Sequence, residues 1–172
     1  SFWRRLLFAA RFGSMQFLMS SDMSRDSQVL YVRNIRDRVQ AIAPFLRYDR
    51  DPYLVLADRR LFWMWDAYVV SDRYPYSQPI EDGINYIRNS VKVVVDAYSG
   101  EVTFYTPDPD EPIIKTLCGI FPGMFVPMDE MPVSLKAHVR YPEDLFVIQA
   151  RVLGKYHTTE PDALYKQEDF WE

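Results

Sequence analysis

The chain has 172 residues, of which 48% are hydrophobic and 16% aromatic, and its formal net charge is −4. This length allows one domain with a sizeable core. Disorder is excluded, because disordered chains have few aromatic residues and a large net charge. The single cysteine, Cys118, excludes an intramolecular disulfide bond, and the negative charge argues against a nucleic-acid partner.

The first 18 residues have the pattern of a basic amphipathic helix. Arg4, Arg5 and Arg11 share one face, and the opposite face is apolar, with Phe2, Trp3, Leu6, Leu7, Ala10 and Phe17. Such a face packs either on the rest of the domain or on a membrane surface, and both alternatives stay open. The longest stretch without a charged residue, 116–128, has 13 residues, whereas a membrane span needs about 20.

The next elements along the chain are a helix and a hairpin. Apolar residues recur at helical spacing over 24–46, where Asp22 or Ser24 can cap the start and Pro44 marks the end. Two strand-like runs, Tyr53–Ala57 and Leu61–Val70, flank a polar turn at 58–60. A loop rich in proline and tyrosine follows at 72–83.

The second half of the chain predicts another hairpin and then helices. Residues 84–89 fit either a short helix or a lead-in, and strands at 90–98 and 101–106 flank Ser99 and Gly100. Helices are expected at 111–120, 132–140 and 142–156, with a last turn at 159–165. The predicted fold class is therefore α+β, with an antiparallel sheet of about four strands from two hairpins packed against helices on one face.

No catalytic or metal-binding motif stands out. The only histidines, His138 and His157, are nineteen residues apart and have no metal-ligand spacing. Cys118 lies in an apolar stretch, which is typical of a buried structural thiol. There is no nucleophile elbow, phosphate-binding loop or dinucleotide fingerprint. We therefore expect no catalytic residues, no metal and no cofactor.

Two polar clusters are the candidate binding residues. The first contains His138, Arg140, Tyr141 and Glu143, followed by Asp144, and the second contains Arg88 and Asn89. Each cluster fits a ligand-binding site, but a structural role is favoured for both: a helix-to-helix corner held by capping and an ion pair for the first, and a network that fixes the sheet to its covering helix for the second.

Several longer motifs resemble one known family. The most specific are Arg33–Phe45, Asn85–Tyr98 and His138–Phe146. Together they resemble uncharacterised protein family 0182, whose members are large bacterial integral membrane proteins with N-terminal membrane helices followed by a large soluble region. The resemblance implies that residues 1–20 are a juxtamembrane segment and that 21–172 form a single soluble domain. The stretch Val91–Tyr105 is also similar to the strand–turn–strand of PepSY domains, which are extracytoplasmic.

The functional expectation is a membrane-proximal binding domain of an integral membrane protein in the cell membrane, on the extracytoplasmic side. Its expected partners are the membrane helices of its parent chain and a protein or envelope ligand, and an enzyme is the less favoured reading. The enzyme alternative is a cell-envelope hydrolase that uses His138, Arg140, Glu143 and His157. A third alternative is a homo-oligomerisation domain. An enzyme would gather these groups in an open cleft, whereas an interaction module would bury polar groups as structural ties and expose an apolar patch.

Overall fold

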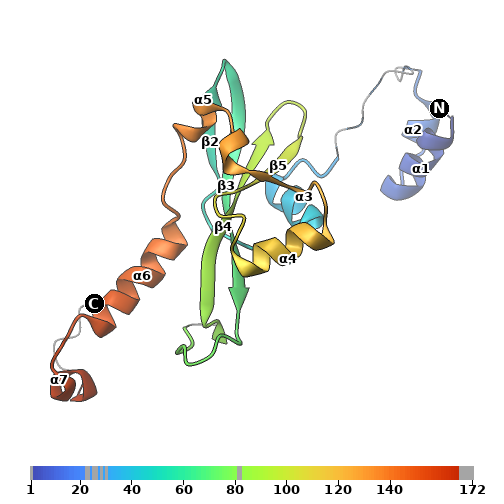
Figure 1. Ribbon diagram of the computed structural model, residues 1–172. Coiled ribbons are helices and arrows are strands. Elements are labelled where there is room, and N and C mark those ends of the chain that lie inside the picture. Colours follow the sequence, from blue (N-terminus) through green and yellow to red (C-terminus); the bar gives the residue numbers. More distant parts are fainter. Residues whose placement is uncertain are drawn as a thin grey trace. The chain divides into compact units, whose positions relative to one another are not determined.

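Figure 1 shows the computed structural model, which describes residues 2–21, 24, 27, 29, 31–80 and 83–166. The chain divides into two compact units, 1–33 and 34–172, and each is described by itself. None of the helices in the described ranges has the length and apolarity needed to cross a membrane.

The N-terminal unit is a helical pair held together by aromatic rings. Helix α1 spans Phe2–Phe12 and α2 spans Gln16–Met19, with Gly13 at φ +62° between them. The rings of Phe8 and Phe17 each stack on Phe12 and are tilted against each other, and Tyr31 meets Phe8 and Phe12 edge-on. Ala9 is buried as well, whereas Phe2, Trp3, Leu6 and Leu7 of α1 stay at the surface.

The larger unit is built on a mixed sheet. Its strands are β1 (Arg47–Tyr48), β2 (Tyr53–Ala57), β3 (Arg60–Ser71), β4 (Tyr86–Asp96), β5 (Val102–Thr106) and β6 (Phe125–Pro127). The order is β1-β3-β4-β5-β6, and β2 also pairs with β3 (Figure 1). Every pair is antiparallel except β5 with β6.

Both predicted hairpins are confirmed. Asp58 and Arg59 form a two-residue turn with positive φ angles of 48° and 62° between β2 and β3, as a tight hairpin requires. The described residues form six strands rather than about four. The additional strands, β1 and β6, have two and three residues, which is too short for a period of two to show in a sequence.

Two helices cover the first face of the sheet. Helix α3 spans Ile35–Ile42, and the Asn34 side chain accepts a hydrogen bond from the Arg36 N–H at its start. Helix α4 spans Pro112–Ile120, and Glu111 caps it through the Ile114 N–H. The core between these helices and the sheet contains Val39, Ala43, Leu46, Trp65, Ala67, Val69, Val91, Val93, Val95, Phe104 and Ile114.

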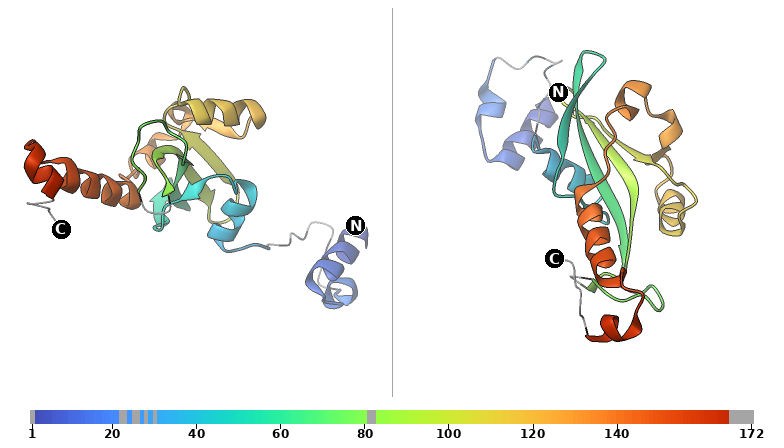
Figure 2. Two further views of the ribbon diagram at one scale, coloured as in Figure 1. Left: turned by 90° about the horizontal axis from the view of Figure 1, so that it is seen from below. Right: turned by 90° about the vertical axis from the view of Figure 1, so that its left-hand side faces the viewer.

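The second face is covered as well, so the expectation that helices pack on only one face was wrong. Short helix η2 (Met128–Glu130) is followed by α5 (Val133–Lys136), and this segment places Met131 and Leu135 against β2, β3, β4 and β5. The second core also contains Tyr53, Val55, Ala57, Met64, Val94 and Tyr105. Helix α6 (Glu143–Tyr156) begins at this face and extends away from the sheet (Figure 2), and α7 spans Pro161–Lys166.

Several predicted boundaries need correction. The helix expected over 24–46 begins only at Ile35, because Asn34 supplies the cap, and Asp22 lies outside the described residues. Residues 84–89 lead into β4, which begins at Tyr86. The helix expected over 132–140 ends at Lys136. The backbone of His138 and Arg140 instead forms hydrogen bonds with the side chains of Tyr53 and Lys92 in the sheet. The helices at 111–120 and 142–156 are confirmed to within a residue.

The tight turn at Gly100 predicts a position-specific effect of adding a methyl group. Gly100 has φ +71°, and a Cβ there would lie 2.8 Å from Nη1 of Arg38, which donates a hydrogen bond to the Gly100 carbonyl. Gly100→Ala should therefore lower the free energy of unfolding by about 1–2 kcal/mol.

Gly119, within α4, is the matched control. A Cβ there meets nothing within 4 Å, so Gly119→Ala should raise stability by about 0.5–1 kcal/mol. Urea unfolding of both variants measures the two changes, and equal effects at both positions would contradict the turn geometry.

Candidate functional site

A buried ion pair lies at the centre of the second face of the sheet. Asp66 on β3 and Lys92 on β4 are directly opposite in the strand register. Their side chains are only 5% and 7% exposed, and Lys92 Nζ donates a hydrogen bond to Asp66 Oδ1. Because side chains alternate along a strand, both point to the same face as Met64 and Val94 of the second core.

Asp49 is a second buried carboxylate beside this pair, and both its carboxylate and its backbone carbonyl accept hydrogen bonds. It is 3% exposed. Its carboxylate accepts bonds from the Tyr68 hydroxyl, from the Asp51 N–H at 2.9 Å and from the Asp144 N–H at 3.0 Å. Its carbonyl accepts a bond from Trp65 Nε1 at 2.6 Å. Asp49 therefore links β1, β3 and the start of α6.

Residues 138–144, which we call the strap, close over these groups. Lys92 Nζ donates to the Arg140 carbonyl at 3.1 Å. The Tyr53 hydroxyl donates to the His138 carbonyl at 3.2 Å and accepts from the Arg140 N–H at 3.3 Å. The Arg140 guanidinium lies 4.3 Å from the centre of the Tyr53 ring, a cation–π contact. The strap is thus held mainly by its backbone.

Burial controls the acid–base properties of the network. Desolvation raises the pKa of Asp66, and it is opposed by the charge of Lys92 and by hydrogen bonds from Lys92 and Asn89. Burial also raises the pKa of Tyr68, as does its bond to Asp49, and it raises the pKa of Tyr53. Both phenols therefore stay protonated at neutral pH and act as hydrogen-bond donors.

An exposed ion pair completes the strap on its solvent side. Arg50 Nε lies 2.7 Å from Asp144 Oδ1 and its Nη2 lies 3.6 Å from Glu143 Oε1, while the Arg50 N–H donates to Asp144 Oδ2 at 3.0 Å. The Arg50 and Glu143 side chains are 62% and 59% exposed. Solvent screening leaves such pairs with little net stabilisation, so the buried contacts hold the strap.

The first cluster of predicted binding residues lies on the strap and at the start of α6. His138 reaches the network through its backbone, and Arg140 does so through its backbone and through the contact of its guanidinium with Tyr53. Tyr141 is 60% exposed, and its hydroxyl bonds to Gln149. Glu143 contacts Arg50 at the surface.

The two residues of the second cluster, Arg88 and Asn89, have different neighbours. Asn89 lies beside Asp66, where its amide favours the ionised carboxylate. Its buried Oδ1 has no hydrogen-bond partner among the residues that the structure describes. Arg88 instead lies over the ring of Tyr86, 5.0 Å from its centre.

The sequence did not predict which residues form the centre of the network. Asp49, Tyr53, Tyr68 and Lys92 belong to different segments, and only the strand register brings them together. The sequence offered one indication of the ion pair. In both strands a charged residue lies two positions from an apolar one and so on the same face, Asp66 beside Met64 on β3 and Lys92 beside Val94 on β4.

The proposed hydrolase residues do not converge. His157 lies past the end of α6, where its Nδ1 contacts the Gly154 carbonyl at 2.8 Å. Helix α6 has 14 residues, or about 21 Å at 1.5 Å per residue, and it separates His157 from Glu143. In the described part of the chain, no three His, Cys, Asp or Glu side chains form a group that could hold a metal ion.

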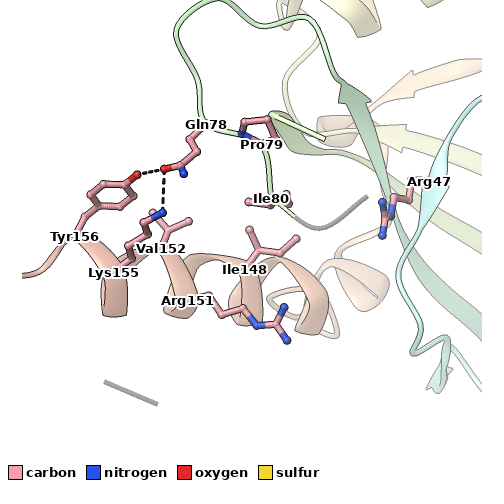
Figure 3. Close-up of a pocket in the computed structure, with 9 residues that line it drawn as sticks. All are labelled: Arg47, Gln78, Pro79, Ile80, Ile148, Arg151, Val152, Lys155 and Tyr156. Carbon is pink, nitrogen blue, oxygen red and sulfur yellow. Dashed lines mark hydrogen bonds between the residues drawn. The ribbon is translucent and has the colours of Figure 1, made fainter. Parts of the chain in front are cut away.

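A surface groove lies between α6 and the loop before β4. Its volume is about 230 Å³. Gln78 Oε1 accepts hydrogen bonds from Tyr156 and, at 3.0 Å, from Lys155, which closes one end (Figure 3). The other lining residues are Arg47, Pro79, Ile80, Ile148, Arg151 and Val152. A second hollow, of about 340 Å³, lies where α6 meets Ile87 of β4. The sheet therefore covers the apolar side of α6 incompletely.

Comparison with known proteins agrees with the resemblance seen in the sequence. A family model described as "Uncharacterised protein family (UPF0182)" matches residues 1–172. The chain belongs to this family. UPF0182 proteins of Desulforamulus reducens, Pelotomaculum thermopropionicum and Nostoc sp. are 54%, 53% and 52% identical to it, each over 99% of this chain. The match covers 19%, 19% and 18% of those relatives, so the chain spans about a fifth of their length. No solved structure matches the chain.

The buried ion pair predicts that removing Lys92 lowers stability most while Asp66 keeps its charge. Lys92→Met leaves the Asp66 carboxylate buried without a cation, which should lower the free energy of unfolding by about 3–5 kcal/mol. Combining it with Asp66→Asn removes the uncompensated charge and should recover part of this loss.

The pH dependence of this loss tests its electrostatic origin. Without Lys92 the pKa of Asp66 rises further in the folded state. Lowering the pH toward the unfolded carboxyl value of about 3.9 neutralises the group preferentially in the folded protein. The deficit of Lys92→Met relative to the unmodified chain should therefore shrink as the pH falls. A deficit independent of pH, measured by urea unfolding, would show that packing alone is lost.

Proposed function

We propose that this chain is a membrane-proximal binding domain of a larger UPF0182 protein, in which α1 lies on the surface of the bilayer. One observation carries the proposal, which is the exposed apolar face of α1. Phe2, Trp3 and Leu7 are 68%, 71% and 70% exposed, and Leu6 is 38% exposed. The aromatic cluster of the N-terminal unit leaves these side chains uncovered.

The charges on α1 fit the same role. Arg4, Arg5 and Arg11 lie within the helix, whose first turn contains no acidic residue. Amphipathic helices with Trp, Phe and Leu on one face and cations on the other lie in the membrane interface. Each cation near an anionic surface adds about 1 kcal/mol of attraction. The expected surface is therefore a bilayer rich in anionic lipid.

The larger unit supports a binding role rather than catalysis. Three of its buried ionisable groups, Asp49, Asp66 and Lys92, are tied to backbone atoms and to each other beneath the strap, and a fourth, Glu111, caps α4. The groove along α6 is instead open at the surface and largely apolar. The proposed ligand is a protein or cell-envelope component, and the proposed partners within the parent protein are its membrane helices.

The proposal places the domain on the extracytoplasmic side, on the basis of the similarity of the β4–β5 hairpin to PepSY domains. Protease added to intact cells that express the full-length protein should then cleave this domain. Protection until lysis would contradict the assignment of side, while membrane association through α1 would still stand.

Vesicle flotation tests the role of α1. The chain should float with phosphatidylglycerol vesicles and bind phosphatidylcholine vesicles much more weakly. Trp3→Ser combined with Leu7→Ser should weaken binding at least about tenfold, because each buried side chain of this size contributes about 1.5–3 kcal/mol. Added salt should weaken binding as well.

Val133→Ser is the matched control. Val133 is 81% exposed in the larger unit, so this variant removes a comparable apolar side chain far from α1 in sequence and should float like the unmodified chain. Equal flotation of the α1 double variant, or equal binding to both kinds of vesicle, would contradict the proposal.

A further inference from the structure

Strand β2 has an open hydrogen-bonding edge. Among the described residues it pairs with β3 alone. The Leu61 carbonyl on β3 accepts a hydrogen bond from the Ala97 N–H at 3.0 Å, on the side of β4. Opposite residues of an antiparallel pair either bond to each other or both point away. Leu56, which lies opposite Leu61, therefore directs its N–H and C=O outward, and by alternation Leu54 does the same.

This edge lacks the usual protection against pairing. The strand Tyr53–Ala57 contains no charged residue and no proline. Leu54 and Leu56 are 45% and 64% exposed, while Val55 between them is buried. Natural edge strands are normally blunted by charges, proline, bulges or covering segments. An uncharged apolar edge of this kind is a surface for strand addition.

We propose that β2 pairs with β2 of a second copy of this chain, antiparallel, around a two-fold axis at Val55. In this register Leu54 lies opposite Leu56 of the partner subunit, and the symmetric pair repeats the contact. Both leucines direct their backbone groups outward, so each of these pairs exchanges two backbone hydrogen bonds. The leucine side chains then cover one another on the exposed face.

The charges at the two ends of the strand fit this register. Asp51 precedes β2 and Arg59 follows it, and both are exposed. Arg59 lies in the turn that leads into β3, so it is not part of the paired strands. Pairing centred on Val55 nevertheless brings Asp51 to the end of the interface where the turn contains Arg59 of the partner subunit. Opposite charges that lie close together at the end of a strand pair attract each other.

Neighbouring registers fit less well. An axis at Leu54 sets Leu56 opposite Pro52 of the partner subunit, and proline has no N–H to donate. An axis at Leu56 sets Asp58 of the partner subunit opposite Leu54. The axis at Val55 alone among the three keeps both leucine pairs.

The interface is small, so the dimer is expected to be weak and dependent on concentration. Five residues of edge offer far less than the roughly 1,600 Å² of a standard interface. Two copies held on the same membrane surface would meet at a higher effective concentration. The pairing itself is independent of lipid, so it should persist in the Trp3→Ser, Leu7→Ser variant.

Sedimentation velocity of the full chain over a wide concentration range, without lipid, tests the proposal. A reversible monomer–dimer equilibrium is expected. Arg59→Glu places an acidic side chain near Asp51 of the partner subunit at both ends and should weaken dimerisation about tenfold. Adding Asp51→Arg restores opposite charges and should restore the dimer, which a folding defect could not do.

Leu56→Pro tests the open edge itself. It removes an N–H that β3 does not use and should abolish the dimer while leaving the circular dichroism spectrum unchanged. Arg73→Glu, at a side chain that is 91% exposed outside β2, is the control and should dimerise normally. A monomer at every concentration, or a dimer insensitive to Arg59→Glu and Leu56→Pro, would overturn the proposal.

Discussion

The buried pair of Asp66 and Lys92 is the constraint on which the second face of the sheet depends. Two opposite charges on neighbouring central strands cannot be buried unless every polar atom finds a partner. The sheet supplies only part of these partners, because Lys92 Nζ donates its other described hydrogen bond to the Arg140 carbonyl of the strap. The buried ion pair of the sheet therefore needs the strap as a hydrogen-bond partner, and the place of Lys92 determines where the strap crosses the sheet.

The same network determines where α6 begins. The Asp144 N–H, one of the unsatisfied groups at the start of α6, donates to the Asp49 carboxylate, so a buried side chain from another part of the chain takes the role of a cap. The helix is anchored firmly at this end, whereas grooves flank its middle and far end. The buried groups Asp49, Asp66 and Lys92 are thus used for architecture, whereas apolar side chains are exposed on α1, in the groove along α6 and at the edge of β2.

Local patterns predicted the parts of the fold that are determined locally. The hairpin β2–β3 follows from alternation around Asp58 and Arg59, and α4 and α6 follow from apolar spacing near prolines. Strands of two or three residues carry no period, so β1 and β6 were missed. The strap was recognised as a dense polar segment, but its role depends on backbone atoms, which residue identities do not reveal. Asp49, Tyr68 and Lys92 could not be connected before the strand register was known.

Hydrogen exchange of individual backbone amides, compared between the unmodified chain and Asp49→Asn, tests the central claim most directly. If the network holds the strap, the amides of Arg140 and Asp144 are protected in the unmodified chain. In the variant they should exchange at least about tenfold faster, corresponding to about 1.4 kcal/mol, while the amides at the centre of β3 and β4 keep their protection. Unchanged exchange in the strap, or equal loss of protection across the whole sheet, would show that the strap is not held by this network.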